Sequence, residues 1–183
     1  MCVCVLVVDV GRLTSYILYC CYDYSLQENI EATRIGQSKK NRKWLTTSYG
    51  ETVVKSVEHK PTICSGSTMG EQAALEQYLR AMVSESDETG TKLMGADQGF
   101  HNYLYYSGKL ANADGIRSIT VQDQGSAIIN NLGAMRTKEL DQWGNGKLVE
   151  QKDGVVRVLN WNGQVSPVVH QFDRHKLLSE YWY

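Results

Sequence analysis

The sequence predicts an α/β fold with a mostly parallel central sheet, and two segments carry that prediction. The chain opens with a continuous apolar run, residues 2–8, whose lack of alternation indicates a central strand covered on both faces. Further along, residues 62–64 read as a short strand, 65–70 as a polar turn and 71–83 as a helix. A strand that turns tightly into a helix is the repeating unit of parallel α/β sheets.

The other elements follow from local patterns. Residues 22–58 predict helical pieces anchored by Trp44 and Leu45 and broken at Gly36 and Gly50. The helix at 71–83 carries apolar residues at three-and-four spacing, which predicts its buried face: Ala74, Leu75, Tyr78, Leu79 and Met82. An Asp-Gly turn predicts a hairpin near residue 153. Five later segments predict strands: 118–122, 127–130, 148–150, 155–159 and 165–171.

Composition favours one ordinary globular domain spanning residues 1–183. The chain is 42% hydrophobic and 21% charged, and its formal net charge of −1 argues against a nucleic-acid partner. The N-terminal apolar run has neither the basic flank of a signal peptide nor the length of a membrane span, so the sequence predicts a soluble domain without assigning a compartment. Five cysteines, four of them near the N-terminus, indicate reduced thiols rather than a disulfide framework.

The densest group of polar side chains lies in a predicted helix at residues 95–106. Asp97 and His101 stand four residues apart on one face, with Gln98 and Asn102 beside them. A functional site is one interpretation of this density. Alternatively, Asp97 is the acid that stabilises the N-terminus of its helix, and His101 only bonds to Asp97.

Two further polar residues border apolar strands. Asp9 follows the first strand and would lie at the carboxyl edge of a parallel sheet, where open α/β folds bind ligands. It is either a ligand there or the cap of a turn. His170 lies in the last predicted strand and is either a metal ligand or a buried core histidine.

Taken in order, five segments resemble the landmarks of the GT-A nucleotide-sugar glycosyltransferases. The resemblance covers most of the chain from Val5 onward and is closest to proteins of algae, other protists and large algal viruses. It implies a three-layer α/β domain whose N-terminal part is shortened. The segments are residues 5–9, 63–70, 95–102, 129–133 and 166–171.

The resemblance also implies the reaction and its participants. Such enzymes transfer a hexosyl group from a nucleotide diphosphate sugar to a glycan or glycoprotein acceptor, usually with Mn²⁺ or Mg²⁺. Asp9 matches the first metal-binding carboxylate and His170 the late metal ligand. Asp97 and Gln98 match the acidic and amide pair beside the transferred sugar, where the carboxylate acts as a base or stabilises an oxocarbenium-like centre.

The resemblance places the predicted substrate-binding residues around that pair. Ser65, Gly66 and Thr68 match the loop under the donor sugar, and His101 and Asn102 complete the set.

Two other functions compete with transfer. A hydrolase would use Ser65 or Cys64 as nucleophile with His170 and Asp173, but the G-x-S-x-G elbow is missing. A glycosyltransferase-like domain that binds carbohydrate or a partner without turnover is the stronger alternative. Its support is Arg12, a cation where related sequences carry a second carboxylate.

Overall fold

The computed structural model describes residues 4–7, 16–20, 24–25, 31–32, 34–122, 128–132, 148–160 and 162–179. They confirm a mixed α/β fold and form two compact units, one with residues 4–7, 16–19 and 34–121, the other with residues 20, 24–25, 31–32 and the described residues from 122 onward. Each unit has its own buried hydrophobic cluster. A single domain over residues 1–183 stays a prediction, because two compact units can belong to one domain.

The sheet of the first unit has the strand order β1-β5-β2-β6. Strand β1 (Cys4–Val7) runs parallel to β5 (Ser67–Gly70), whereas β2 (Tyr16–Cys20) runs antiparallel to β5; β6 (Ser118–Gln122) follows β2. The sheet is therefore mixed rather than mostly parallel, and in the described order β1 lies at its edge rather than at its centre.

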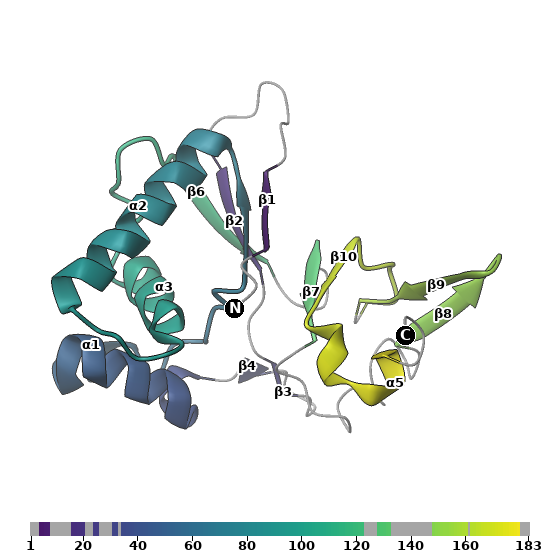
Figure 1. Ribbon diagram of the computed structural model, residues 1–183, viewed down its shortest axis with the longest axis horizontal. Helices are drawn as coiled ribbons and strands as arrows, with labels where there is room; N and C mark the ends of the chain where they lie inside the picture. Colours follow the sequence, from purple (N-terminus) through teal and green to yellow (C-terminus); the bar gives the residue numbers. More distant parts are fainter. Residues whose placement is uncertain are drawn as a thin grey trace. The chain divides into compact units, whose positions relative to one another are not determined.

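Three helices gather on one side of these strands (Figure 1). They are α1 (Lys39–Val57), α2 (Gln72–Thr89) and α3 (Ala96–Tyr106), and α3 packs against both others. Ile35, Leu45, Val54 and Val57 form a buried cluster against which Tyr103 of α3 packs. Helix α3 is thus held at the middle of the unit. The three-layer arrangement stays a prediction.

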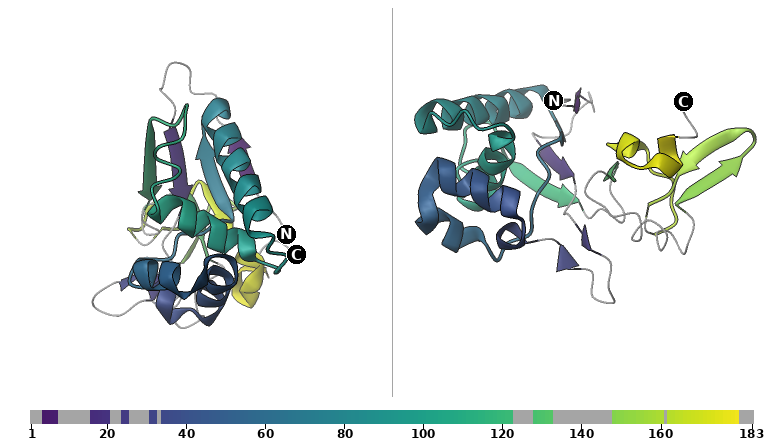
Figure 2. Two further views of the ribbon diagram at one scale, coloured as in Figure 1. Left: turned by 90° about the vertical axis from the view of Figure 1, so that its left-hand side faces the viewer. Right: turned by 60° about the horizontal axis from the view of Figure 1, so that its bottom comes forward.

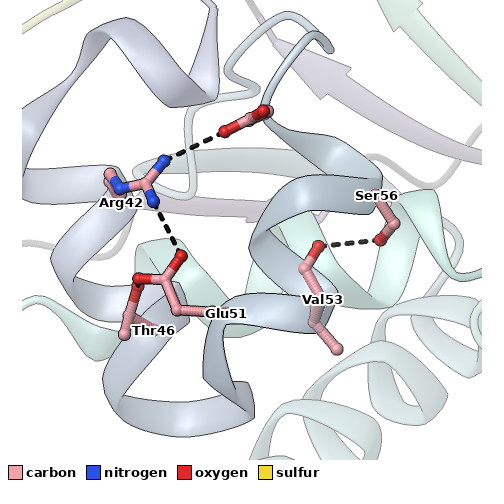
Figure 3. Close-up of polar contacts among 6 residues, drawn as sticks. Arg42, Thr46, Glu51, Val53 and Ser56 are labelled. Carbon is pink, nitrogen blue, oxygen red and sulfur yellow. Dashed lines mark hydrogen bonds and ion pairs between the residues drawn. The ribbon is translucent and has the colours of Figure 1, made fainter.

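Gly50 interrupts α1, as the sequence predicts. Its φ of 79° and ψ of 171° lie outside the helical region and split the helix at a kink. Figure 3 shows how the two halves are braced: Arg42 reaches Glu51 beyond the kink at 2.7 Å, and Thr46 donates to the same carboxylate at 3.2 Å. Arg42 also bonds Glu58 at 2.9 Å, while Ser56 bonds the carbonyl of Val53 within the second half.

We expect Gly50→Ala to lower the free energy of unfolding by about 1–3 kcal/mol, because this φ/ψ pair is accessible almost only to glycine. Nothing lies within 4 Å of a Cβ at Gly50, so the cost is that of the backbone alone. Gly90→Ala is the matched control, since Gly90 is equally open but has a left-handed φ of 59° and ψ of 16° that other residues tolerate better. Urea denaturation measures the free energy of unfolding of both variants. Equal losses in Gly50→Ala and Gly90→Ala would contradict the glycine-specific backbone conformation at Gly50.

The second unit contains two short pairs of strands beyond residue 122. Strands β7 (Ile129–Asn131) and β10 (Val168–His170) run parallel, and β8 (Val149–Lys152) and β9 (Val155–Val158) form an antiparallel hairpin (Figure 2). Asp153 and Gly154 both have positive φ, which confirms the predicted turn. Leu132, Leu148, Val158 and Leu178 form the buried cluster.

The small elements complete the described chain. A two-stranded antiparallel pair joins β3 (Tyr24–Ser25) and β4 (Glu31–Ala32). Short helical turns cover the segments Ile35–Gln37, Phe172–Arg174 and Lys176–Ser179.

Several predicted boundaries are wrong: the region 22–58, expected to be helical, contains the strands β3 and β4, and β7 and β10 differ from the expected 127–130 and 165–171. Two further errors have identifiable reasons. The strand expected at residues 62–64 lies instead at β5, inside the expected turn, because side chains of α3 take the backbone hydrogen bonds of Ile63. Helix α2 continues to Thr89 rather than to residue 83, and it ends where Gly90 adopts a left-handed conformation.

Candidate functional site

The start of α3 is fixed by close packing of glycine against tryptophan. Gly95 has a φ of 86°, and a Cβ there would lie 2.5 Å from Cζ2 of Trp44. The Trp44 indole donates to the carbonyl of Met94 at 3.0 Å. Only glycine satisfies both the conformation and the space, and the first turn of α3 therefore has a defined position.

Asp97 and Gln98 in that first turn meet the loop before β5. Ser65 Oγ lies 3.0 Å from Asp97 Oδ2 and 3.2 Å from Gln98 Oε1, while the Ser65 backbone N–H donates to Gln98 Oε1 at 3.0 Å. Gln98 Nε2 donates to the carbonyl of Ile63. The structure thus brings together predicted catalytic and substrate-binding residues more than thirty positions apart in the sequence.

Asn102 binds the same loop one turn further along α3. Its side chain accepts from the Ile63 N–H at 2.9 Å and donates to the Ile63 carbonyl at 2.9 Å. It also donates to the carbonyl of Gln98 at 2.8 Å. The buried Asn102 amide bonds both the N–H and the carbonyl of Ile63, as the backbone of a neighbouring strand would, so it positions the loop before β5. Direct contact of Asn102 with a substrate stays a prediction.

Asp97, Ser65 and Thr68 line a small cavity of about 80 Å³. The rest of the wall is mainly apolar and comes from α2: Leu75, Tyr78, Leu79 and Met82. Asp97 and Ser65 are half-buried, whereas Thr68 is buried. Gly66, another predicted substrate-binding residue, is also half-buried and donates its N–H to the Cys64 sulfur at 3.3 Å.

His101 is fully buried and does not line this cavity, but it contacts Tyr78, which does. Its Nδ1 shares a hydrogen bond of 2.9 Å with the Tyr78 hydroxyl. Burial lowers the pKa of His101 to about 3, so the imidazole is neutral at pH 7. Burial also raises the pKa of Tyr78, which keeps the phenol protonated. The pair supports the cavity wall, and substrate contact by His101 stays a prediction.

His101 makes the protein less stable in acid. The pKa is about 3 when folded and about 6.5 when unfolded, so between these values the unfolded chain binds the extra proton and stability falls as pH falls. Between pH 7.5 and 5 we expect His101 to account for a loss of about 2 kcal/mol in the free energy of unfolding. His101→Gln should flatten that dependence in urea melts, with the exposed His59→Gln as control. An unchanged slope in His101→Gln would contradict the assignment.

Sequence analysis missed a second polar cluster, around Glu85 on α2. This carboxylate is only 3% exposed, and it accepts from Tyr49 at 2.7 Å and from Lys109 at 2.6 Å. The hydrogen bond to Glu85 raises the pKa of Lys109. Lys109 also lies 5.2 Å from the ring centre of Tyr103, which stacks on Tyr49. The signal was available, because Glu85 continues the buried stripe of Ala74, Leu75 and Tyr78 by helical spacing.

Of the two predicted metal ligands, the structure describes only His170. Asp9 lies outside the described residues. His170 ends β10 in the second unit, is buried, and is aligned with Asn131 of β7. Within the described ranges, no group of three or more His, Cys, Asp or Glu side chains could hold an ion. Mn²⁺ or Mg²⁺ therefore stays a prediction.

The second unit also brings two of the sequence landmarks into contact. Asn130 of β7 donates to Asn160 Oδ1 and to Ser166 Oγ, both at 3.1 Å, and Ser166 donates to Asn160 Oδ1 at 2.6 Å. Ser166 precedes β10, whose strand pairs with β7. The segments 129–133 and 166–171 are therefore joined by both backbone and buried side chains.

Neither a known protein-family model, nor a curated protein, nor a solved structure matches this chain. Among the helices of the described ranges, none combines the length and apolar character that crossing a bilayer requires. Cys64, whose side chain is described, forms no disulfide.

Proposed function

We propose that this chain is a nucleotide-sugar glycosyltransferase of the GT-A type, which transfers a hexosyl group from a nucleotide diphosphate sugar to a glycan or glycoprotein. The observation that carries the proposal is the contact of Asp97 with Ser65 in the wall of the cavity that Thr68 also lines. The catalytic carboxylate and the donor-sugar loop that the resemblance implies are adjacent in space.

The chemistry assigned to Asp97 requires a carboxylate at a fixed position. In transfer, the bond between the anomeric carbon and the diphosphate breaks, the electron pair leaves with the diphosphate, and the acceptor oxygen bonds to that carbon. The acceptor loses its hydroxyl proton. Asp97 either accepts this proton or stabilises positive charge at the anomeric carbon. Ser65 donates to one carboxylate oxygen, which fixes the group while leaving further acceptor positions on it.

The arrangement of the landmarks supports the same proposal. Segments 63–70 and 95–102 meet in the first unit, and segments 129–133 and 166–171 meet in the second. A three-layer GT-A domain with a shortened N-terminal part is the fold proposed for the chain, and Mn²⁺ or Mg²⁺ bound by Asp9 and His170 is the proposed cofactor.

A carbohydrate-binding domain without turnover is the second candidate. The observation that favours it is the engagement of Gln98 and Asn102 with the backbone of residues 63–65, which gives both amides a structural task. Such a domain would bind sugars at the same cavity and release no nucleotide.

Turnover of nucleotide sugars separates the two candidates. We expect purified protein, supplied with Mn²⁺ and a panel of UDP- and GDP-hexoses, to release the nucleoside diphosphate from at least one donor by transfer to water or to an added glycan mixture. Chromatography of the nucleotides measures the release. No release from any donor by a folded sample would overturn the transferase proposal in favour of the binding domain.

A further inference from the structure

One flank of α1 presents a group of exposed lysines. Residues 32–50 contain five cations and no acidic residue. Three of these cations, Lys39, Lys40 and Lys43, are exposed and form what we call the lysine flank. Within the described part of the chain, their side chains take part in no hydrogen bond or ion pair. The flank therefore carries uncompensated positive charge, although the chain as a whole has a net charge of −1.

Helical geometry separates the lysine flank from Arg42. At about 3.6 residues per turn, Lys40, Lys43 and Lys39 follow Trp44 in that order around α1. Arg42 lies on the side of the helix opposite Trp44, where it donates to Glu51 and Glu58 (Figure 3). These two carboxylates are engaged by Arg42, and the lysines remain available to an anion from outside the described residues.

The lysine flank adjoins the junction between α1 and the start of α3. Trp44, which is next to Lys40 around the helix, packs against Gly95 and donates to the carbonyl of Met94. Asp97 follows Gly95 by two residues in the first turn of α3. The lysines and the carboxylate proposed for catalysis therefore border the same junction.

The α3 side of this junction adds a further cation and an apolar group. Lys92 is exposed, and its side chain pairs with no group of the described residues. It precedes Met94 by two residues, so their Cα atoms are at most about 7 Å apart. Met94 itself is 85% exposed. Ammonium groups bind oxyanions through charge-assisted hydrogen bonds, and an exposed methionine side chain can pack against the apolar face of a sugar ring.

We propose that the lysine flank binds an anionic glycan, one that carries carboxylate or sulfate groups. The inference rests on the proposed function in taking a glycan as the partner, and it adds that the acceptor is negatively charged. The anionic groups bind the lysines while a neighbouring sugar of the same chain reaches Asp97. DNA fits this surface less well, because proteins bind it by neutralising many phosphates at once and this chain has a net charge of −1.

The test compares hexasaccharides that differ in charge. The probes are neutral maltohexaose, sulfated maltohexaose and hexagalacturonate, which separate sulfate from carboxylate as the recognised group, together with a short duplex DNA. Calorimetry measures their affinities. At about 50 mM NaCl we expect at least one anionic hexasaccharide to bind at least about tenfold more tightly than neutral maltohexaose and more tightly than the DNA. Most of that advantage should be lost at about 300 mM NaCl, because salt screens exposed charges.

Two double variants with the same change in charge connect this binding to the lysine flank. Lys40→Gln combined with Lys43→Gln should weaken the binding of the anionic hexasaccharide about fivefold to tenfold, since each exposed ion pair contributes modestly. Lys55→Gln combined with Lys152→Gln, at exposed positions outside the flank, should change it less than about twofold. None of the four side chains has a described partner, so both variants should fold, and thermal melts establish that they do.

Several results would overturn the inference. They are equal affinity for charged and neutral hexasaccharides, no binding of any hexasaccharide, equal losses in the two double variants, and DNA binding as tight as that of the anionic hexasaccharide. Failure here is distinguishable from failure of the proposed function. A preference for the anionic glycan without nucleotide release would retain the inference and overturn the transferase in favour of the binding domain. Nucleotide release without the preference would do the reverse.

Discussion

Asp97→Asn is expected to lower the rate of nucleoside diphosphate release by at least about 100-fold. A positioned general acid or base commonly contributes between about 10² and 10⁴ in rate, and the amide can neither accept the proton nor stabilise a cationic centre to the same extent. The substituted side chain keeps an oxygen for the hydrogen bond from Ser65, which is 3.0 Å long in the structure. The fold should therefore persist while turnover is lost.

The matched control for Asp97→Asn is the same change at Asp114, an exposed residue after α3. We expect Asp114→Asn to retain full turnover. Rates come from single-donor assays at saturating substrate, and circular dichroism establishes the folded state of both variants. Turnover of Asp97→Asn within a factor of two of the wild type would remove Asp97 from the mechanism.

Asn102→Leu should cause the largest loss of stability, about 3–5 kcal/mol in the free energy of unfolding. Leucine has a similar volume but leaves the Ile63 N–H without its acceptor, and both residues are buried. An unsatisfied buried backbone group costs about 1–3 kcal/mol, and the bonds to the carbonyls of Ile63 and Gln98 are lost in addition. For a chain whose total stability is about 5–15 kcal/mol, this variant is close to unfolding.

Asn112→Leu is the control for Asn102→Leu. The exposed Asn112 side chain donates to the carbonyl of Gly108, at 2.9 Å, a group that water can satisfy after substitution. We expect a loss below about 1 kcal/mol there. Urea denaturation at pH 7.5 gives both values. A small loss in Asn102→Leu, comparable to that of Asn112→Leu, would show that Asn102 does not position the loop at residues 63–65.

Local sequence patterns predicted the elements whose cause is local. The Asp153-Gly154 turn, the interruption at Gly50 and the helical segment around Asp97 each depend on residues a few positions apart. The same holds for the buried stripe through Leu75 and Tyr78, apart from Leu79, which is 44% exposed.

The errors arose where distant residues decide the structure. The short strand expected at residues 62–64 was displaced because Gln98 and Asn102, more than thirty positions away, take its hydrogen bonds. The partners of Glu85, Tyr49 and Lys109, are 36 and 24 positions away, so helical spacing could predict that Glu85 is buried but not which groups pair with it. For the site, only the resemblance predicted that Asp97 and Ser65 lie near each other. No local sequence pattern pairs the first turn of a helix with a loop more than thirty positions away.

Calorimetry of the purified protein with UDP and with GDP, each with and without Mn²⁺, tests the central claim most directly, because it addresses the donor before any acceptor is known. The account predicts binding of at least one nucleoside diphosphate that strengthens when Mn²⁺ is present and weakens in His170→Ala. Absence of binding of both nucleotides by a folded sample, with and without Mn²⁺, would contradict the assignment of a nucleotide-sugar transferase.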